Sequence, residues 1–247
     1  RIRDEFVQII RGQNAGEVLK SYRDVISVFI PEVMPCFDFE QHSPYHKYDV
    51  WEHTVNAVSE CIDKENVKLA MFFHDIAKPE CFTVDFSGRG HFKGHAQKSA
   101  LKAEAVMKKM RFPKSVILNV KAIIYHHSDE LNTEFELKKI LNQIGVRNAF
   151  DLIDAQRADS LSKQDFCKER LKKSDMQEQS LRDILNRGEC FSIKMLDING
   201  YDLIELGFKG IEIKNALSLL LDNVMRGIVE NSRDSLMYRA KSIKNGL

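Results

Sequence analysis

Cysteine is scarce in this sequence and follows no pattern. The 247 residues include five cysteines, and no two are close enough to form a C-x-x-C pair. An odd number without such pairs disfavours both a disulfide framework and a zinc site built from thiolates. The cysteine content therefore favours a reducing compartment, and we expect a cytoplasmic protein.

Long apolar runs are also missing. No stretch approaches the roughly 20 apolar residues that a membrane-spanning helix needs. The opening segment RIRDEFVQII carries charges where a secretory signal would be apolar. Proline and glycine are few, at 5 and 12 residues, and 43% of the residues are apolar, which excludes a collagen-like or disordered chain. We expect a globular protein with no membrane partner; the sequence leaves its oligomeric state open.

Neither charge sign is in excess. The chain has 37 basic and 36 acidic residues, so any contact with nucleic acid must come from a local patch. One candidate patch lies within residues 106–128, which contain no Asp or Glu. Its basic residues are Lys108, Lys109, Arg111, Lys114 and Lys121. These residues provide either a field for an anionic substrate or an ordinary basic surface, and the sequence leaves both interpretations open.

Helical periodicity dominates the chain and predicts an almost all-α protein. The expected helices cover residues 2–11, 14–30, 49–62, 67–77, 95–110, 114–127, 134–144 and 147–162, with three more between 196 and 247. Asn14 and Asp49 are candidate N-caps, and residues 31–48 read as a loop.

Two segments depart from that helical pattern. Residues 81–92, CFTVDFSGRGHF, have two short β-prone runs around a glycine-containing turn, which predicts one hairpin. Residues 162–189 hold 13 charges of mixed sign in 28 residues. This density predicts a long solvated helix, and a helix facing nucleic acid is the alternative.

All eight histidines lie between His42 and His127. Four segments in predicted helices, or at helix ends, contain candidate metal ligands. They are His53 in DVWEHT, His74-Asp75 in AMFFHDIAKP, His126-His127 in IIYHHSD, and Asp159 in DAQRADSL. Imidazole and carboxylate ligands suit Zn, Fe, Mn, Ni or Co. A lone histidine such as His53 is also common as a hydrogen-bonded core residue. The His74-Asp75 pair is more informative, because a buried carboxylate is unfavourable unless it is paired or bound to metal.

The order of His53, His74-Asp75 and Asp159 resembles the HD phosphohydrolase superfamily. Longer segments resemble the carboxy-terminal half of bacterial tRNA nucleotidyltransferases (CCA-adding enzymes) that carry an HD domain. These segments are NAGEVLKSYRDVI, PYHKYDVWEHTVNAV, LAMFFHDIAKPECFTVDFSGRGHFKGHAQKSA, IIYHH and NGYDLIELGFKGIEIKNALSLLLDNVMRG. The resemblance implies an all-α HD-domain helical bundle with one small β-hairpin, flanked by additional helices. It implies an N-terminal helical segment at 1–44, an HD metal-binding domain at 45–165 and a C-terminal helical region at 166–247.

The sequence departs from that family in two places. The nucleotide-adding head of the family needs a Gly-Gly/Ser turn followed by a D-x-D pair, and this chain has no such segment. Its glycine-rich stretch GRGHFKG matches neither a Rossmann nor a P-loop motif. The tail segment LGFKGIEIKNAL lacks the small, glycine-containing turn that usually follows its LG. We therefore expect no nucleotide addition by this chain alone. Because it begins with Arg1, we expect either a fragment or a headless relative.

The resemblance also implies a site. The ligands of a first divalent ion (Mn, Fe, Ni, Co, Zn or Mg) are His53, His74, Asp75 and Asp159. Asp75 could bridge to a second ion, with His95 and His126 as its further ligands. Asp75 and Lys78 are the implied catalytic residues, although Lys78 could equally be a solvated helix-end lysine. The candidate substrate contacts are His91, His127 and Arg89. His127 could instead be a metal ligand, and His91 could instead be an exposed turn residue.

Three functions remain open on this basis. The first is a metal-dependent phosphohydrolase that acts on nucleotides, cyclic phosphates or RNA ends. The second is a tRNA-binding module of a CCA-adding enzyme in which the metal site is mainly structural. The third is a signalling hydrolase of the (p)ppGpp or deoxynucleotide type. The complete ligand set favours the first function over the second, and the resemblance of the tail favours a tRNA context over the third.

Overall fold

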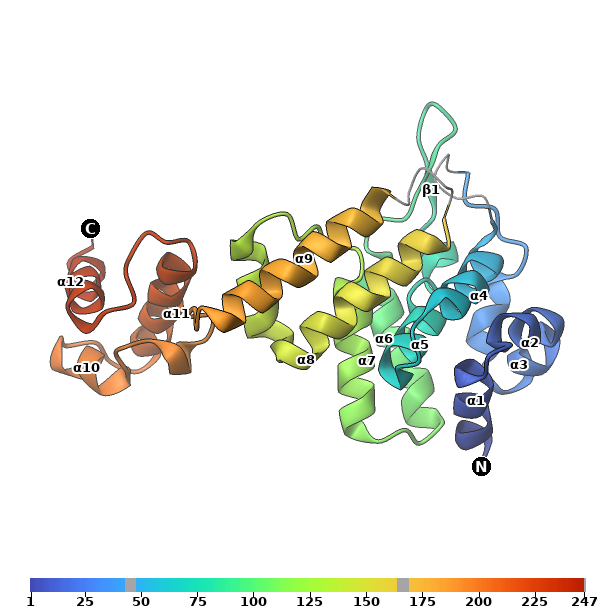
Figure 1. Cartoon of the computed structure of the whole chain (residues 1–247), viewed down its shortest axis with the longest axis horizontal. Coiled ribbons are helices and arrows are strands. Elements are labelled where there is room, and N and C mark those ends of the chain that lie inside the picture. The colour runs from blue at the N-terminus through green and yellow to red at the C-terminus, as the bar shows by residue number, and fades with distance from the viewer. Residues whose placement is uncertain (43–47, 164–168, 247) are drawn as a thin grey trace. The chain divides into compact units, whose positions relative to one another are not determined.

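The computed structural model describes residues 1–42, 48–163 and 169–246. The regular structure of these residues is almost entirely helical (Figure 1). The β-structure among them is a single antiparallel pair, strand β1 at Thr83–Val84 and strand β2 at Gly90–His91. The predictions of an all-α fold and of one small hairpin are both confirmed. None of the described helices is long and apolar enough to cross a membrane.

The chain divides into two compact units. The first unit comprises residues 1–130 and 146–178, and the second comprises residues 131–145 and 179–247. The three segments expected from the sequence remain a prediction about domain organisation. The first unit contains all the candidate ligands, so most of the following description concerns it.

The first unit begins with three short helices, α1 at Ile2–Arg11, α2 at Ala15–Ser21 and α3 at Arg23–Phe29. The expectation of one helix over 14–30 is wrong, because Tyr22 leaves helical geometry at φ −115° and ψ 28°. Asn14 makes no side-chain cap. Part of the expected loop is ordered as a 3₁₀ helix at Pro31–Cys36, which buries Val33.

Four helices build the centre of the first unit: α4 at Val50–Glu60, α5 at Glu65–Phe73, α6 at His95–Lys109 and α7 at Lys114–His126. Asp49 caps α4 as predicted, since its carboxylate accepts a hydrogen bond from Glu52 N at 2.8 Å. Helix α5 is buried from Asn66 to Phe73. The long apolar run on α5 therefore forms the core against which the neighbouring helices pack.

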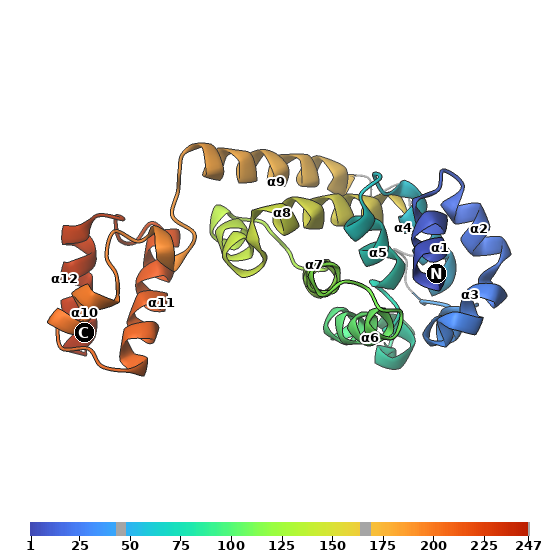
Figure 2. The same cartoon turned by 90° about the horizontal axis from the view of Figure 1, so that it is seen from below.

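Helix α8 spans Glu134–Leu161 and is kinked at Gly145, which has φ 77° and ψ 165°. The sequence predicted helices on both sides of this glycine, and a left-handed φ at this position explains the break. Helix α9 follows at Glu169–Asn186, and in the first unit it runs beside α8 (Figure 2). Arg157 on α8 joins the two helices, because it donates hydrogen bonds to Asp175 and Glu178, each at 3.0 Å.

The prediction of a long solvated helix at 162–189 is only partly right, and residues 164–168 of that range lie outside the described residues. Helix α9 is rich in charge, but Ser174 is only 3% exposed and Gln177 only 6%. Leu181 and Ile184 on the same helix are also buried. Spacings of three and four residues place these four side chains on one face of the helix. The other faces carry the charges that dominate the sequence pattern, while this face is packed.

The second unit has its own core. It contains a 3₁₀ turn at Ile193–Met195 and helices α10 at Gly200–Glu205, α11 at Ile211–Met225 and α12 at Arg233–Lys244. Leu203, Leu220 and Leu236 are fully buried in this core. A capping box fixes the start of α10, in which Asn199 and Asp202 bond to each other's backbone. The three helices predicted for 196–247 are therefore present.

Candidate metal centre

His53 lies on α4 with 1% of its surface exposed. Its Nδ1 lies 3.0 Å from Ser162 Oγ, and the Ser162 hydroxyl donates to the Asp159 backbone oxygen at 2.8 Å. Because that hydroxyl proton is already used, Ser162 accepts the proton of His53 Nδ1. The arrangement turns His53 Nε2 toward the cluster, where it lies 3.2 Å from His74 Nε2.

The His74-Asp75 pair follows the end of α5. The sequence predicted a helix as far as Ala77, but α5 ends at Phe73 and a turn begins. In a continued helix the Asp75 carbonyl would bond to the nitrogen of Pro79, which carries no proton. Lys78 N takes that carbonyl instead, at 2.9 Å. The tighter turn holds both candidate ligands inside the core, where His74 and Asp75 are at most 1% exposed.

Asp159 on α8 completes a first ligand group with His53 and His74. Asp159 Oδ1 lies 3.0 Å from His53 Nε2 and 3.7 Å from His74 Nε2. The three ligand atoms all lie within 4.8 Å of one another, a separation that suits one metal ion. Asp75 Oδ2 lies beside them, 3.4 Å from His53 Nε2 and 3.0 Å from His74 Nε2.

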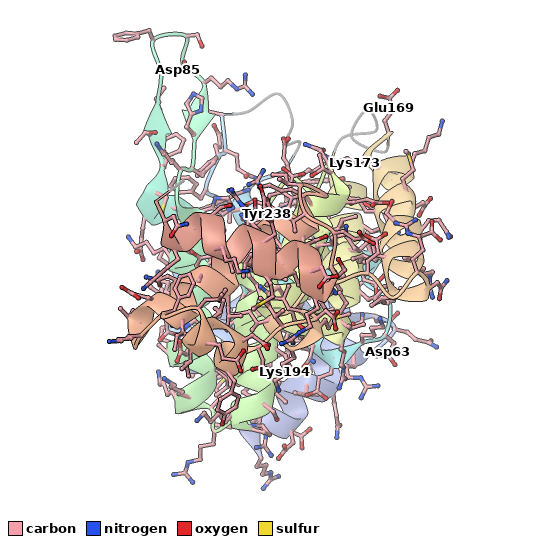
Figure 3. All side chains as sticks on the ribbon, turned by 90° about the vertical axis from the view of Figure 1, so that its left-hand side faces the viewer. Asp63, Asp85, Glu169, Lys173, Lys194 and Tyr238 are labelled. Atoms are coloured by element: carbon pink, nitrogen blue, oxygen red, sulfur yellow. The ribbon has the colours of Figure 1, made fainter. Side chains whose placement is uncertain are left out.

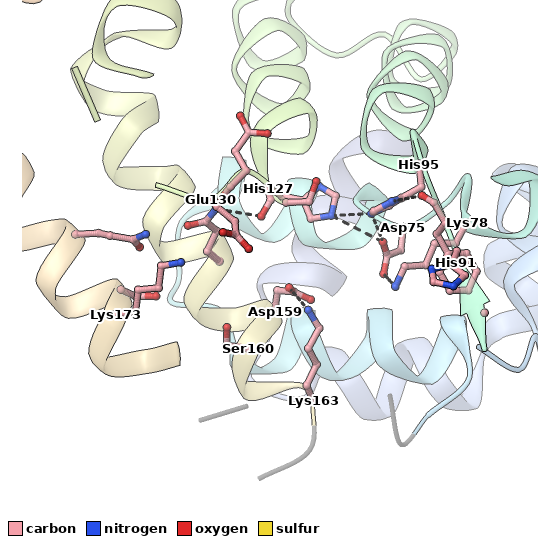
Figure 4. Close-up of a pocket in the computed structure, with 17 residues that line it drawn as sticks. Asp75, Lys78, His91, His95, His127, Glu130, Asp159, Ser160, Lys163 and Lys173 are labelled. Atoms are coloured by element: carbon pink, nitrogen blue, oxygen red, sulfur yellow. Dashed lines mark hydrogen bonds and ion pairs between the residues drawn. The ribbon is translucent and has the colours of Figure 1, made fainter. Parts of the chain in front are cut away.

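The other oxygen of Asp75 faces a second ligand group, which we define as His95, His127 and Asp75 Oδ1. His95 Nε2 lies 3.3 Å from this oxygen and His127 Nε2 lies 3.9 Å from it. The two imidazoles also face each other, with 3.2 Å between their Nε2 atoms (Figure 4). Asp75 therefore stands between the two groups and presents one carboxylate oxygen to each.

The structure brings His127, and not the expected His126, to His95. His126 turns away, and its Nδ1 lies 2.6 Å from Asp129 Oδ2. Consecutive residues on a helix project about 100° apart, so only one of the two can face the cluster. His127 is the C-cap of α7 and is 5% exposed, which places its ring on the inner side.

The protonation pattern of the histidines shows that the cluster suits a cation. Each of three imidazoles donates its Nδ1–H to a backbone carbonyl: His74 to Met71 at 2.7 Å, His95 to Phe92 at 2.8 Å and His127 to Ile124 at 2.7 Å. A carbonyl can only accept, so Nδ1 carries the proton and Nε2 faces the cluster, where the neutral form of the ring presents a lone pair. Lone pairs that meet at 3.2 Å repel unless a cation lies between them.

Burial keeps several of these imidazoles neutral. It lowers the pKa of His53 to about 4, against the opposing effect of Asp159. It lowers the pKa of His127 to about 3, and the charge of His74 acts in the same direction. The pKa of His95 is also lowered, mainly by burial. Neutral imidazole is the form that binds metal, so the resting protonation state fits the ligand role.

Asp75 is the buried carboxylate at the centre of the cluster. Burial alone would raise its pKa, but the charges of His74 and Lys78 outweigh that effect and hold the pKa well below its usual range. Among the described residues, neither Asp75 oxygen receives a hydrogen bond of good geometry, although Lys78 Nζ lies 2.7 Å from Oδ2. A buried carboxylate that lacks hydrogen bonds is unfavourable without a cation. The donor set of imidazole nitrogens and carboxylate oxygens therefore fits one or two divalent ions.

Lys78 is buried, with only 5% of its surface exposed, so it is not the solvated helix-end lysine that the sequence also allowed. Besides Asp75, its ammonium donates to Gln41 Oε1 at 2.8 Å and lies 5.2 Å from the centre of the Phe92 ring. Lys163 has a comparable place on the other side of the cluster, where its Nζ bonds to Asp159 Oδ2. Each of the two ligand carboxylates is therefore held by one lysine.

These groups open into a cavity of about 410 Å³. Of the candidate substrate contacts, His91 and His127 line it, whereas Arg89 is not among its lining residues; the other sequence candidates that line it are Asp75, Lys78, His95 and Asp159. His91 is about half exposed and its Nε2 lies 2.7 Å from Asp85 Oδ2. None of the five basic residues in 106–128 lines the cavity, and Glu104 binds two of them, Lys108 and Lys121. That patch is an ordinary surface with respect to this site.

Sequence reasoning missed one wall of the cavity. It is formed by Lys173, Ser174 and Gln177 of α9, and Lys173 lies on the side opposite Lys78 and His91 (Figure 4). The Lys173 ammonium has no acidic partner among the described residues. The sequence contained no signal for this wall, because it depends on how α9 packs against α8.

Comparison with known proteins shows the family of the chain and one of its relatives. Residues 46–184 match the HD domain family, which is more than half of the chain. The chain is also 28% identical over 254 aligned residues to a CC-adding tRNA nucleotidyltransferase of Thermus thermophilus. The match covers 96% of this chain and 56% of the relative, so the chain spans about half the length of that protein. The chain therefore belongs to the HD domain family, and it is similar over most of its length to part of a tRNA nucleotidyltransferase.

Proposed function

We propose that this protein is a metal-dependent phosphohydrolase that cleaves phosphoesters of nucleotides or RNA ends. The observation that carries the proposal is the convergence of four imidazoles on Asp75, with their Nε2 atoms in two pairs that are each 3.2 Å apart. A divalent ion held there would supply Lewis acidity toward water and toward a phosphoryl oxygen. We assign His53, His74, Asp159 and Asp75 to a first ion, and His95, His127 and Asp75 to a second.

The remaining residues of the cavity suit a phosphoester. Lys78 keeps Asp75 ionised and Lys163 does the same for Asp159, so both carboxylates remain acceptors toward a cation. Lys173 supplies a cation from α9, on the side of the cavity away from Lys78. An anionic group is attracted to such a site, because the cations are fixed before the substrate arrives.

A second candidate is a tRNA-binding module whose metal is mainly structural. It is favoured by the relationship over 96% of the chain to a protein named as acting on tRNA. In this alternative the ligand cluster stabilises the first unit without any turnover. A partner with a nucleotide-adding head would then supply the chemistry.

One experiment separates the two candidates. The purified full chain is stripped of metal, reloaded with Mn²⁺, Ni²⁺, Co²⁺ or Mg²⁺, and assayed on bis-p-nitrophenyl phosphate and on 2′,3′-cyclic nucleotides. We expect turnover that Asp75→Asn abolishes. The matched control is Asp129→Asn, a cavity carboxylate bonded to His126 rather than to the cluster, and it should retain activity. Absence of turnover with every metal, together with tRNA binding that Asp75→Asn leaves unchanged, would instead establish the binding module.

A further inference from the structure

The hairpin that walls the cavity carries an isolated aromatic residue at its tip. Phe86 is fully exposed, whereas the two phenylalanines at the base of the hairpin are packed. The ring of Phe82 lies 5.3 Å from Phe39 and 5.4 Å from Phe92, between centroids. Phe86 contributes to neither this cluster nor the core, so the fold of the chain does not account for it.

The tip that presents Phe86 is a turn that several hydrogen bonds hold closed. Asp85 accepts hydrogen bonds from Ser87 N at 2.9 Å, Ser87 Oγ at 2.6 Å and Arg89 N at 3.1 Å. Asp85 N donates to Arg89 O at 3.0 Å, and Gly88 adopts a left-handed φ of 81°. These bonds use the Asp85 carboxylate internally and hold the turn in one geometry. Phe86 is therefore held out toward solvent by a fixed turn.

The base of the hairpin is anchored as firmly as its tip. Gly90 N donates to His42 O at 2.8 Å, and a Cβ atom on Gly90 would lie 2.3 Å from the Gln41 carbonyl oxygen. Only glycine permits this close approach. Gly90 and His91 also line the metal cavity. The hairpin thus joins the cavity to a projecting tip, where Asp85 is labelled in Figure 3.

We propose that this hairpin is an arm on which Phe86 stacks with a base of single-stranded nucleic acid. Exposed aromatic rings beside cations are the usual platform for unpaired bases. Arg89 at the tip and Lys93 beyond β2 are exposed and supply the cations. The proposal rests on the proposed function for its placement, because the phosphoester of the same strand would lie in the cavity.

The spacing indicates an oligonucleotide rather than a mononucleotide. Two or three residues separate Gly90 from the tip, which is about 7–10 Å at roughly 3.3 Å per residue. Stacked nucleotides rise about 3.4 Å each, so about two or three nucleotides bridge the cavity and Phe86. We therefore expect an oligonucleotide to engage the cavity and the Phe86 ring at once.

The test compares Phe86→Ala and Phe86→Trp in the full chain, with a short single-stranded oligonucleotide and the matching mononucleotide as probes. Loss of one base stack should weaken oligonucleotide binding by about 5- to 150-fold in Phe86→Ala. Phe86→Trp should retain binding and report it by fluorescence quenching, since the one natural tryptophan, Trp51, is buried. Val84→Ala truncates another exposed apolar residue of the hairpin and is the matched control, with binding unchanged.

The outcomes separate this proposal from the proposed function. Turnover of bis-p-nitrophenyl phosphate should be the same in Phe86→Ala and in the wild type, because that small substrate stays in the cavity. If no metal gives turnover but Phe86→Ala still weakens oligonucleotide binding, the arm stands and the hydrolase proposal fails. Equal oligonucleotide affinity in Phe86→Ala and wild type would overturn the arm. So would self-association that Phe86→Ala abolishes while oligonucleotide binding is unchanged, because Phe86 would then be a protein contact.

Discussion

The adjacent histidines at the end of α7 allow a sharp test of the metal centre. His127 Nε2 lies 3.2 Å from His95 Nε2, whereas His126 bonds to Asp129 outside the cluster. We therefore expect His127→Ala to lose one of two bound divalent ions per chain and His126→Ala to lose neither. The two variants remove the same side chain from neighbouring positions, so composition and helix propensity are matched.

The magnitudes follow from what each side chain contacts. Disturbing residues that only orient a metal ligand weakens metal binding by about 10- to 100-fold. Loss of the His127 ligand itself should weaken the second ion by at least about 100-fold, or about 2.7 kcal/mol. His126→Ala removes an ion pair whose Asp129 side chain is 41% exposed. Such a pair contributes at most about 1 kcal/mol to folding and nothing to metal affinity.

The assay is the metal content of each variant after dialysis against limiting Mn²⁺ or Ni²⁺, with titration calorimetry for the affinities. Circular dichroism checks that both variants are folded. We expect about two ions in the wild type and His126→Ala, and about one in His127→Ala, as the two ligand groups imply. Loss of an ion in His126→Ala with full occupancy in His127→Ala would refute the second ligand group.

Other predictions concern stability, substrate and thiols. Metal at 100 times its Kd should stabilise the first unit by about 2.7 kcal/mol and raise its Tm by about 5–10 °C, and scanning calorimetry with EDTA should reverse this. Lys173→Ala should raise KM about fivefold, through loss of about 1 kcal/mol, whereas the exposed Lys172→Ala should not; equal KM values would exclude the α9 wall from substrate binding. Burial raises the pKa of Cys36 and of Cys61 to about 12. Their thiols therefore stay protonated at pH 8 and should resist a thiol reagent in the folded protein. Rapid labelling of either, mapped by mass spectrometry, would contradict their burial.

The sequence allowed much of the fold and of the first ligand group to be anticipated. Long apolar patterns locate α4, α5 and α7, because period and length together identify a buried helix. His74 and Asp75 stand out since charges inside an apolar run need a partner. Their roles as ligands remain predictions, but the structure does bring their side chains together with His53 and Asp159.

The choice between His126 and His127 could not be made from the sequence. The two residues lie at the end of a helix, where an error of one residue in its phase rotates the side chain by about 100°. The deciding facts are the hydrogen bonds of His127 Nδ1 to Ile124 O at 2.7 Å and of His126 to Asp129. Both depend on the geometry of the last turn, which periodicity does not resolve.

The α9 wall of the cavity could not be predicted from the sequence for a different reason. The charge density of α9 predicts an exposed helix, and most of the α9 surface is exposed, but Ser174 and Gln177 are buried. Polar residues on a packed face produce no hydrophobic periodicity, so the pattern contains no sign of the contact. Only tertiary structure shows that this helix faces the cavity.

Asp75 makes the two ligand groups interdependent. Its Oδ2 lies 3.0 Å from His74 Nε2 and its Oδ1 lies 3.3 Å from His95 Nε2, so one buried charge serves both groups. A cation bound in one group leaves less of the negative charge of Asp75 to balance a cation in the other group, because a single carboxylate neutralises only one positive charge. The second ion should therefore bind more weakly than the first, and removal of Asp75 should weaken both. The first group contains a further carboxylate, Asp159, and this extra charge makes it the tighter of the two.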